Sequence, residues 1–322
     1  MHNNIHFIIG IWRSGTTLIR EVLGMSKLVK IFPEHFVLLN QIDKAKDFEK
    51  IRWKMLADIT NNPDFIHFAQ PNIQQLEKDF AKARCFEEAI LATYKSCLKE
   101  NESASIFIDK NPIYSYYLPQ LIELFPQAKF VWMLREPKDN GISRAKHHIQ
   151  SFKNNSYLAN WWNLTNEQIE KQATKYPDKF LLVPYDFMVQ EPEPWIKKIC
   201  HFLEVEFNPE MLAFEKKREE RITDFILAAK ARDGEISEDY ASKKKAMWEN
   251  LQKPINTSKT KQWEQVLNLK QIESVDKISS EYYQNLLEGN FGFKPSYSLG
   301  FKSLARLSLA KLKWDIQRKT LS

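Results

Sequence analysis

The sequence predicts an α/β fold: a central parallel β-sheet flanked by helices, with a helical insertion after the first strand–helix unit. Short apolar runs alternate along the chain with segments of helical periodicity, as in parallel strands joined by helices. Near the N-terminus, one apolar run enters a turn of Gly, Ser and Thr and continues as an amphipathic helix. Residues 40–105 carry helical periodicity and many charges but no convincing strand, so we interpret them as the insertion.

The expected strands are short, apolar and separated by helical segments. They are His6–Ile11, Ile106–Ile108, Lys129–Leu134 and Lys179–Val183. The expected helices cover residues 16–25, 114–125, 137 to about 150, and 194–203. Pro126 stops the second of these helices, and Pro137 stands at a first-turn position that proline favours. Residues 210–250 are polar and are expected to form exposed helix and loop.

Composition excludes several protein classes. The chain has 322 residues, of which 43% are hydrophobic and 27% charged, as in soluble globular proteins. These values exclude wholesale disorder, a collagen-like fibre and a multi-span membrane protein. The net charge of +6 is mild for this length. It fits an anionic ligand, but a nucleic-acid-binding protein is usually more basic, so we expect no nucleic-acid partner.

The cysteines and the N-terminus indicate a cytoplasmic protein. Cys85, Cys97 and Cys200 are an odd, sparse set without metal-ligand spacing, which fits a reducing compartment rather than a disulfide scaffold. The first residues have no basic region and only a short apolar run, unlike a signal peptide. No stretch approaches the length of a membrane span.

The positive charge is concentrated at the C-terminus. Residues 300–322 hold six basic residues and one acid, so this segment carries +5 of the +6. Its apolar residues recur at helical spacing, which predicts a basic amphipathic helix separate from a main domain of residues 1–299. Such a helix can make peripheral contact with an anionic membrane or dock on a partner. Packing on its own domain with a solvated basic face is an equally good interpretation.

Residues 10–17, Gly-Ile-Trp-Arg-Ser-Gly-Thr-Thr, predict an anion site. Glycines let backbone amides approach a ligand, and the start of the following helix favours negative charge. Arg13 adds a planar fork of donors for phosphate or sulfate oxygens. The spacing is P-loop-like, but Thr16 stands where an NTP-hydrolysing P-loop has lysine. The alternative is a tight strand–helix turn with a threonine cap.

A second stretch, residues 130–137, points to the same edge of the sheet. Arg135 stands where a strand ends, and Ser143 lies about two turns into the next helix. Both are expected near the carboxyl edge of a parallel sheet, where ligands bind. A surface Arg–Glu pair and a helix-facing serine are the alternative interpretation. Two anion sites on one edge suit a ligand with two separate phosphate-like groups.

These stretches carry a resemblance to a known family. WRSGTTLIREVL followed by FVWMLREPKDNGISR resembles the two nucleotide signatures of sulfotransferases that use 3′-phosphoadenosine 5′-phosphosulfate (PAPS). Tyr185-Asp186-Phe187 with Glu191-Pro192 is similar to a third family segment, although Asp-Phe replaces Glu-Asp. KPINTS at 253–258, with Lys261 and Trp263, resembles the late segment of the tyrosylprotein and carbohydrate branch. The resemblance covers about residues 5–293.

The resemblance implies a PAPS-dependent sulfotransferase that needs no metal. Its sulfuryl group passes in line to an acceptor hydroxyl or amine, and adenosine 3′,5′-bisphosphate leaves. The first motif would cradle the 5′-phosphosulfate and the second would bind the 3′-phosphate. The cofactor-binding residues implied in this way are Arg13, Ser14, Gly15, Thr16, Thr17, Arg135, Ser143, Tyr185 and Lys261.

Four residues are candidates for the chemistry itself. Arg13 is placed to stabilise charge on the leaving oxygen. Glu34 matches a region where related enzymes have a glutamate base, and neighbouring His35 has a more convenient pKa for that role. Lys110 follows a strand on the same edge, where related sulfotransferases carry a lysine that reaches the sulfuryl group. A solvated Glu34 and a loop Lys110 are the plain alternatives.

Other functions remain open at this point. A small-molecule kinase would share the loop, although the missing lysine speaks against it, and a non-catalytic nucleotide-binding protein would keep the same residues. Trp161 and Trp162 could line an acceptor site, with helix packing expected for at least one. A carbohydrate, a peptide tyrosine, a lipid and a small molecule all remain possible acceptors.

Overall fold

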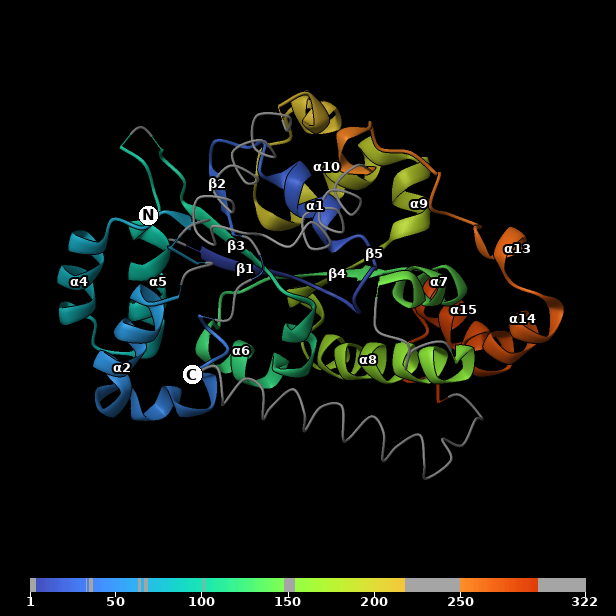
Figure 1. The fold of residues 1–322 in the computed structure, drawn as a ribbon, viewed down its shortest axis with the longest axis horizontal. Helices are drawn as coiled ribbons and strands as arrows, with labels where there is room; N and C mark the ends of the chain where they lie inside the picture. The colour runs from blue at the N-terminus through green and yellow to red at the C-terminus, as the bar shows by residue number, and fades with distance from the viewer. Residues whose placement is uncertain are drawn as a thin grey trace, which may run out of the picture.

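The computed structural model describes residues 4–294 apart from 33, 35–36, 63–64, 67–68, 101, 148–153 and 218–249. At its centre lies a sheet of five parallel strands in the order β2-β3-β1-β4-β5 (Figure 1). The strands are β1 (Asn4–Ile9), β2 (Val29–Ile31), β3 (Ile106–Lys110), β4 (Phe130–Leu134) and β5 (Phe180–Pro184). This arrangement confirms the predicted α/β class and its parallel sheet.

Helices cover both faces of the sheet. On one face lie α1 (Thr16–Leu23), α9 (Tyr185–Gln190) and α10 (Pro192–Leu203), which pack apolar residues against Ile8, Val131 and Val183 (Figure 1). The other face carries η2 (Pro112–Tyr116), α6 (Leu118–Leu124) and α8 (Asn155–Lys175). Strands buried on both faces explain the near-continuous apolar runs of β3 and β4.

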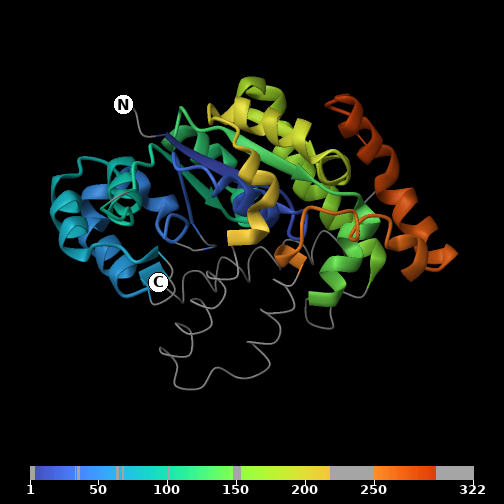
Figure 2. The same cartoon turned by 90° about the horizontal axis from the view of Figure 1, so that it is seen from above.

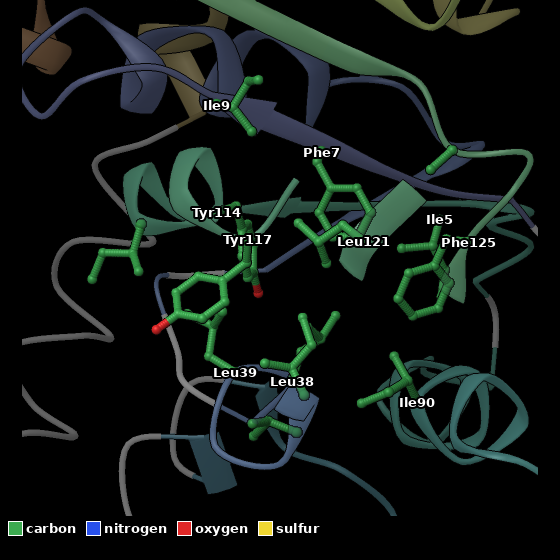
Figure 3. Packing of buried hydrophobic residues seen from close by; sticks show 14 of the residues in the cluster. Ile5, Phe7, Ile9, Leu38, Leu39, Ile90, Tyr114, Tyr117, Leu121 and Phe125 are labelled. Atoms are coloured by element: carbon green, nitrogen blue, oxygen red, sulfur yellow. The ribbon is translucent and has the colours of Figure 1, made fainter. Parts of the chain in front are cut away.

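The segment between β2 and β3 is helical, and its described residues contain no strand. It comprises η1 (Ile42–Asp47), α2 (Phe48–Thr60), α4 (Ile73–Lys82) and α5 (Phe86–Ser96). Figure 3 shows Leu38, Leu39 and Ile90 directed toward side chains of β1 and α6, so this segment joins the main core. The predicted helical insertion is therefore confirmed as part of the fold.

The later helices gather at the opposite end of the molecule from α2, α4 and α5 (Figures 1 and 2). They are α7 (Pro137–His147), α13 (Trp263–Val266), α14 (Leu269–Val275), the π-helix η7 (Asp276–Ser280) and α15 (Glu281–Glu288). Three short 3-10 helices complete the described elements: η4 (Pro177–Lys179), η5 (Pro209–Lys217) and η6 (Asn250–Gln252). None of the helices that the structure describes is long and apolar enough to cross a membrane.

Several predicted boundaries need correction. The first strand ends at Ile9, not Ile11, because Gly10 turns the chain with a φ of +138°. The helix expected over 114–125 begins only at Leu118, where Pro119 occupies the first turn. Strand β2 and helix α8 were not expected. The tail 300–322, the proposed boundary at 299 and most of 210–250 lie outside the described residues, so these remain predictions.

Candidate active site

The site lies where the strand order reverses. Strand β1 is central, and its neighbours β3 and β4 are reached on opposite sides of it. In open parallel sheets a crevice forms at the carboxyl ends of such strands, and ligands bind there. The loop from β1 to α1, the end of β3 and the start of α7 all lie at this edge.

The loop from Gly10 to Gly15 has a backbone that requires glycine at both ends. Gly15 has a φ of +90°, and a Cβ built there would stand 2.4 Å from Cδ2 of Tyr185. At Gly10 the same construction puts Cβ 2.5 Å from the carbonyl oxygen of Met133. Arg13 also adopts a positive φ, 72°, which is uncommon for a residue with a side chain and concentrates at functional sites.

Helix α1 begins without a side-chain cap. Its N-cap is Gly15, and no side chain accepts a hydrogen bond from its first turn within the described structure. The alternative of a threonine-capped turn is therefore not what the structure shows. The first amides of a helix have no acceptor inside it, and its dipole places partial positive charge there. The start of α1 at Thr16 and Thr17 thus offers donors to an anion.

Arg13 joins the two predicted anion sites. Its Nε donates to Oγ of Ser143 on α7 at 3.1 Å. Burial and the nearby charge of Arg135 both lower the pKa of Arg13, so two cations share this half-buried region. A bound anion would offset that repulsion.

Arg135 is 5% exposed, and its guanidinium carbon lies 5.0 Å from the centre of the Tyr185 ring. Its Nη1 donates to the backbone oxygen of Arg13 at 2.9 Å, and its Nη2 donates to that of Lys259 at 2.6 Å. The buried Nε has no hydrogen-bond partner. Since a buried donor without an acceptor is costly, this atom fits a site that receives an anionic group.

Lys110, Glu34 and Thr17 form a second group at the same edge. Lys110 is the last residue of β3 and is 1% exposed. Its Nζ donates to the Glu34 carboxylate and, at 3.2 Å, to Oγ1 of Thr17. Burial lowers the pKa of Lys110, and the Glu34 charge opposes that shift. Two residues predicted to take part in the chemistry are thus in direct contact beside the anion loop.

The remaining predicted residues have mixed placements. Ser14 is fully buried, and its Oγ accepts a hydrogen bond from Asn140, so its side chain faces the protein interior. Tyr185 packs beneath the loop, as its approach to Gly15 shows. Lys261 has an exposed side chain, whereas the backbone of Lys259, two residues earlier, contacts Arg135. His35 lies outside the described residues.

Comparison with known proteins places the chain in a family. A model of the sulfotransferase family matches residues 6–209, which is more than half of the chain. The chain belongs to the sulfotransferase family.

Two relatives are protein-tyrosine sulfotransferases. That of Danio rerio, protein-tyrosine sulfotransferase 1, is 28% identical over 263 residues, covering 80% of this chain and 64% of the relative. That of Drosophila melanogaster is 29% identical over 216 residues, covering 65% of this chain and 40% of the relative. The chain therefore spans less than two thirds of the length of either relative.

A solved structure supports the fold of this chain. The sulfotransferase domain from the curacin biosynthetic pathway aligns with a TM-score of 0.56 at 18% identity, covering 88% of this chain and 98% of that domain. At this identity the likeness concerns the fold, which is the P-loop-like sulfotransferase fold that the sequence predicts.

The loop from Gly10 to Gly15 is also supported by two side chains that were not predicted from the sequence. Ser115 Oγ accepts from the Gly10 amide at 3.2 Å, and Asn140 Nδ2 donates to the Trp12 carbonyl oxygen at 2.9 Å. Asn140 lies within the quoted stretch FVWMLREPKDNGISR, residues 130–144, and Ser115 stands five residues after Lys110. That proximity was the only available signal, because a polar residue in a first turn is more often a simple cap.

The two adjacent tryptophans differ in burial, and one of them, Trp162, has the helix-packing position that was expected for at least one. Trp162 is fully buried, and its Nε1 donates to the backbone oxygen of Arg135 at 2.9 Å, so it packs in the protein interior. Trp161 is half-buried and meets Trp12 edge to face, with ring centres 5.7 Å apart. Its Nε1 donates to Tyr116 Oη at 2.6 Å. These three rings form an aromatic group beside Arg13.

Proposed function

We propose that this sulfotransferase moves the sulfuryl group of PAPS to an acceptor hydroxyl or amine, with adenosine 3′,5′-bisphosphate as the second product. The hydrogen bond between Arg13 and Ser143 carries the proposal most directly. It joins an anion loop at a helix start to a second cationic site that holds Arg135, as a ligand with two separated anionic groups requires. The names of the relatives agree with sulfuryl transfer.

The step proposed for these residues is an in-line displacement. The acceptor oxygen forms a bond to sulfur while the bond from sulfur to the bridging oxygen breaks, and the bisphosphate leaves with the electron pair. Arg13, the first amides of α1 and the Lys110 ammonium would stabilise the charge that grows on the bridging oxygen. The acceptor proton would pass to the Glu34 carboxylate. No metal enters this step.

Glu34 suits the role of base because of its contact with Lys110. The hydrogen bond from the Lys110 ammonium holds the Glu34 carboxylate beside the loop where the donor is proposed to bind. The Glu34 side chain is 47% exposed, so an acceptor arriving from solvent can reach it. His35 remains the second candidate for the base.

The acceptor would lie beside the aromatic group of Trp12, Tyr116 and Trp161. Aromatic faces accommodate a phenol, a sugar ring or an apolar chain, so the proposed acceptors remain a peptide tyrosine, a carbohydrate, a lipid or a small molecule. We also propose a cytoplasmic location, with the basic tail 300–322 available for peripheral membrane contact.

Ligand-induced thermal stabilisation tests the donor class. Adenosine 3′,5′-bisphosphate should raise the melting temperature of the full chain, because a ligand that binds only the folded state stabilises it. ATP with Mg²⁺ should have little effect. If ATP–Mg²⁺ raises the melting temperature and the bisphosphate does not, the result would favour a small-molecule kinase instead. Incubation with ³⁵S-labelled PAPS and a cell extract should then label the acceptor, and nucleotide binding without any labelled product would favour a non-catalytic role.

A further inference from the structure

The segment 259–263 is fastened to the start of α7 by several contacts. Asp139 is 1% exposed, and its Oδ1 accepts a hydrogen bond from the Trp263 amide at 3.1 Å. The amides of Lys261 and Gln262 face the same carboxylate. Helix α13 has no side-chain cap of its own, so Asp139 supplies the acceptor for its first amides from another part of the chain.

Two neighbours of Asp139 strengthen this attachment. Arg135 Nη2 donates to the Lys259 carbonyl oxygen at 2.6 Å. The Lys138 ammonium lies 4.5 Å from the centre of a ring of Trp263, a cation–π contact. The stretch of residues 130–144 therefore holds the segment 259–263 at both ends: Arg135 binds Lys259, and Asp139 binds Trp263. Lys261 between them has a φ of 54°, a conformation that needs support from its surroundings.

The attached segment brings another cation, Lys259, close to Arg135, because the Lys259 carbonyl oxygen accepts from Arg135 Nη2 at 2.6 Å. Burial and then the charges of Lys146, Arg135, Lys253 and Arg13 lower the pKa of Lys259. All four of these groups are cations, and their repulsion disfavours the charged form of Lys259. Collecting cations in this way is unfavourable in the empty protein and becomes favourable when a multiply charged anion binds among them.

From these contacts we propose that Asp139 is a positioning residue, which holds 259–263 against the donor site so that the Lys259 ammonium reaches the 3′-phosphate of the donor. The proposal rests on the proposed function, because PAPS supplies that phosphate. Asp139 acts through the segment and contacts neither donor nor acceptor. Lys259, rather than the exposed Lys261, then supplies the cation of the late segment.

The two residues should have separable effects on nucleotide binding. Asp139→Ala removes a charged acceptor, which should weaken binding of adenosine 3′,5′-bisphosphate about tenfold, mainly through faster dissociation. Asp139→Asn keeps one acceptor oxygen for the Trp263 amide and should restore part of the affinity. Lys259→Ala should weaken the bisphosphate by a similar factor but leave adenosine 5′-monophosphate unaffected, because that nucleotide has no 3′-phosphate.

The experiment measures affinity and dissociation rate of both nucleotides for the full chain, by calorimetry and stopped flow. Glu193→Ala and Lys197→Ala are matched controls, since these residues form an exposed pair on α10 and should bind as the wild type does. Circular dichroism checks that each variant folds. If Asp139→Ala does not fold, hydrogen exchange of the 261–263 amides in Asp139→Asn decides, and faster exchange with faster dissociation is expected.

The outcomes separate this inference from the proposed function. A wild type that binds no bisphosphate would refute the proposed donor. A wild type that binds it, with Asp139 variants indistinguishable from the controls in dissociation or in exchange, would overturn the positioning role. Equal losses for the two nucleotides in Lys259→Ala would overturn the assignment of Lys259 to the 3′-phosphate.

Discussion

Arg13 and Ser143 are 130 positions apart in the sequence, yet Arg13 Nε donates to Ser143 Oγ at 3.1 Å. One belongs to the loop after β1 and the other to the helix after β4. The contact makes the two cationic sites parts of one surface, because displacement of α7 would withdraw a support from Arg13. It also explains how Arg13 keeps a positive φ, since Arg135 binds its carbonyl oxygen at the same time.

Replacing Arg135 by alanine should weaken binding of adenosine 3′,5′-bisphosphate by about 10- to 100-fold, because at least one desolvated charge-assisted contact is lost. Isothermal calorimetry measures the effect. Arg135→Lys is the matched variant: it keeps the charge but not the planar fork, so its affinity should fall between the other two. Unchanged affinity in Arg135→Ala would mean that the 3′-phosphate binds elsewhere.

Glu34→Gln should retain nucleotide affinity and lose turnover by about 10²- to 10⁴-fold, because the amide cannot accept the acceptor proton. Single-turnover transfer of ³⁵S from PAPS, together with a binding isotherm, separates the two effects. Glu206→Gln, an exposed change near the end of α10, is the control. Full activity in Glu34→Gln would move the base elsewhere, and His35→Gln would then be tested in the same way.

The transfer rate should fall with rising pH as Lys110 loses its proton. Burial lowers the pKa of Lys110, so the charged form that stabilises the leaving oxygen is lost at a lower pH than for an ordinary lysine. Glu34 raises that pKa, and Glu34→Gln should therefore move the alkaline fall to still lower pH in the residual activity. A pH–rate profile measures both. If the rate falls at the same alkaline pH in the wild type and in Glu34→Gln, the proposed effect of Glu34 on the pKa of Lys110 is contradicted.

Gly15→Ala should destabilise the fold by about 1–3 kcal/mol and abolish tight nucleotide binding. The added Cβ would meet the Tyr185 ring at 2.4 Å, in a backbone with a φ of +90°. Urea denaturation measures the loss. Gly289→Ala is a matched control, because its φ of +75° imposes similar backbone strain while nothing lies within 4 Å of its Cβ. Equal losses at both glycines would show that the contact with Tyr185 is unimportant.

His6 should make the protein lose stability in mild acid. Burial lowers the pKa of His6 from 6.5 to about 4, and its Nδ1 accepts from the Lys129 amide at 3.1 Å. Because the unfolded state binds the proton first, stability is complete above pH 6.5 and falls as the pH drops toward 4, by roughly 2–3 kcal/mol. Urea denaturation at pH 7 and pH 4.5 tests this, and His6→Gln should show a smaller decrease. Equal decreases in the two proteins would disprove the assignment.

Local sequence patterns predicted most of the sheet and its class. Strands β1, β3, β4 and β5 were expected from apolar runs within about two residues of their ends. Strand β2 was missed because it has only three residues, with Lys30 in the middle, and it forms through pairing with β3. Helix α8 was missed because its polar residues dilute the apolar period, and its stability comes from packing against other elements.

Some residues of the candidate site could likewise be selected from the sequence, and others were found only in the structure. Gly10, Arg13 and Gly15 could be selected as candidates from the sequence, because a strand, a glycine-rich turn and a helix start are together typical of an anion-binding loop. Asn140 and Ser115 could not be identified, because their importance lies in hydrogen bonds to distant backbone atoms. The contact between the late segment and Arg135 also needed the structure: the motif resemblance pointed to Lys261, and the structure adds that the backbone oxygen of Lys259 accepts a hydrogen bond from Arg135.

The sequence by itself determined the α/β class and the position of the glycine-bounded loop after the first strand, and it predicted which residue types there could bind anionic groups. These properties depend on backbone preferences and hydrophobic periodicity over a few neighbouring residues. Only the tertiary structure decided which of those residues meet. Lys110 and Glu34 are 76 positions apart and touch because β2, which ends three residues before Glu34, pairs with β3, which ends at Lys110. Such a contact depends on strand order and packing, which no local pattern encodes.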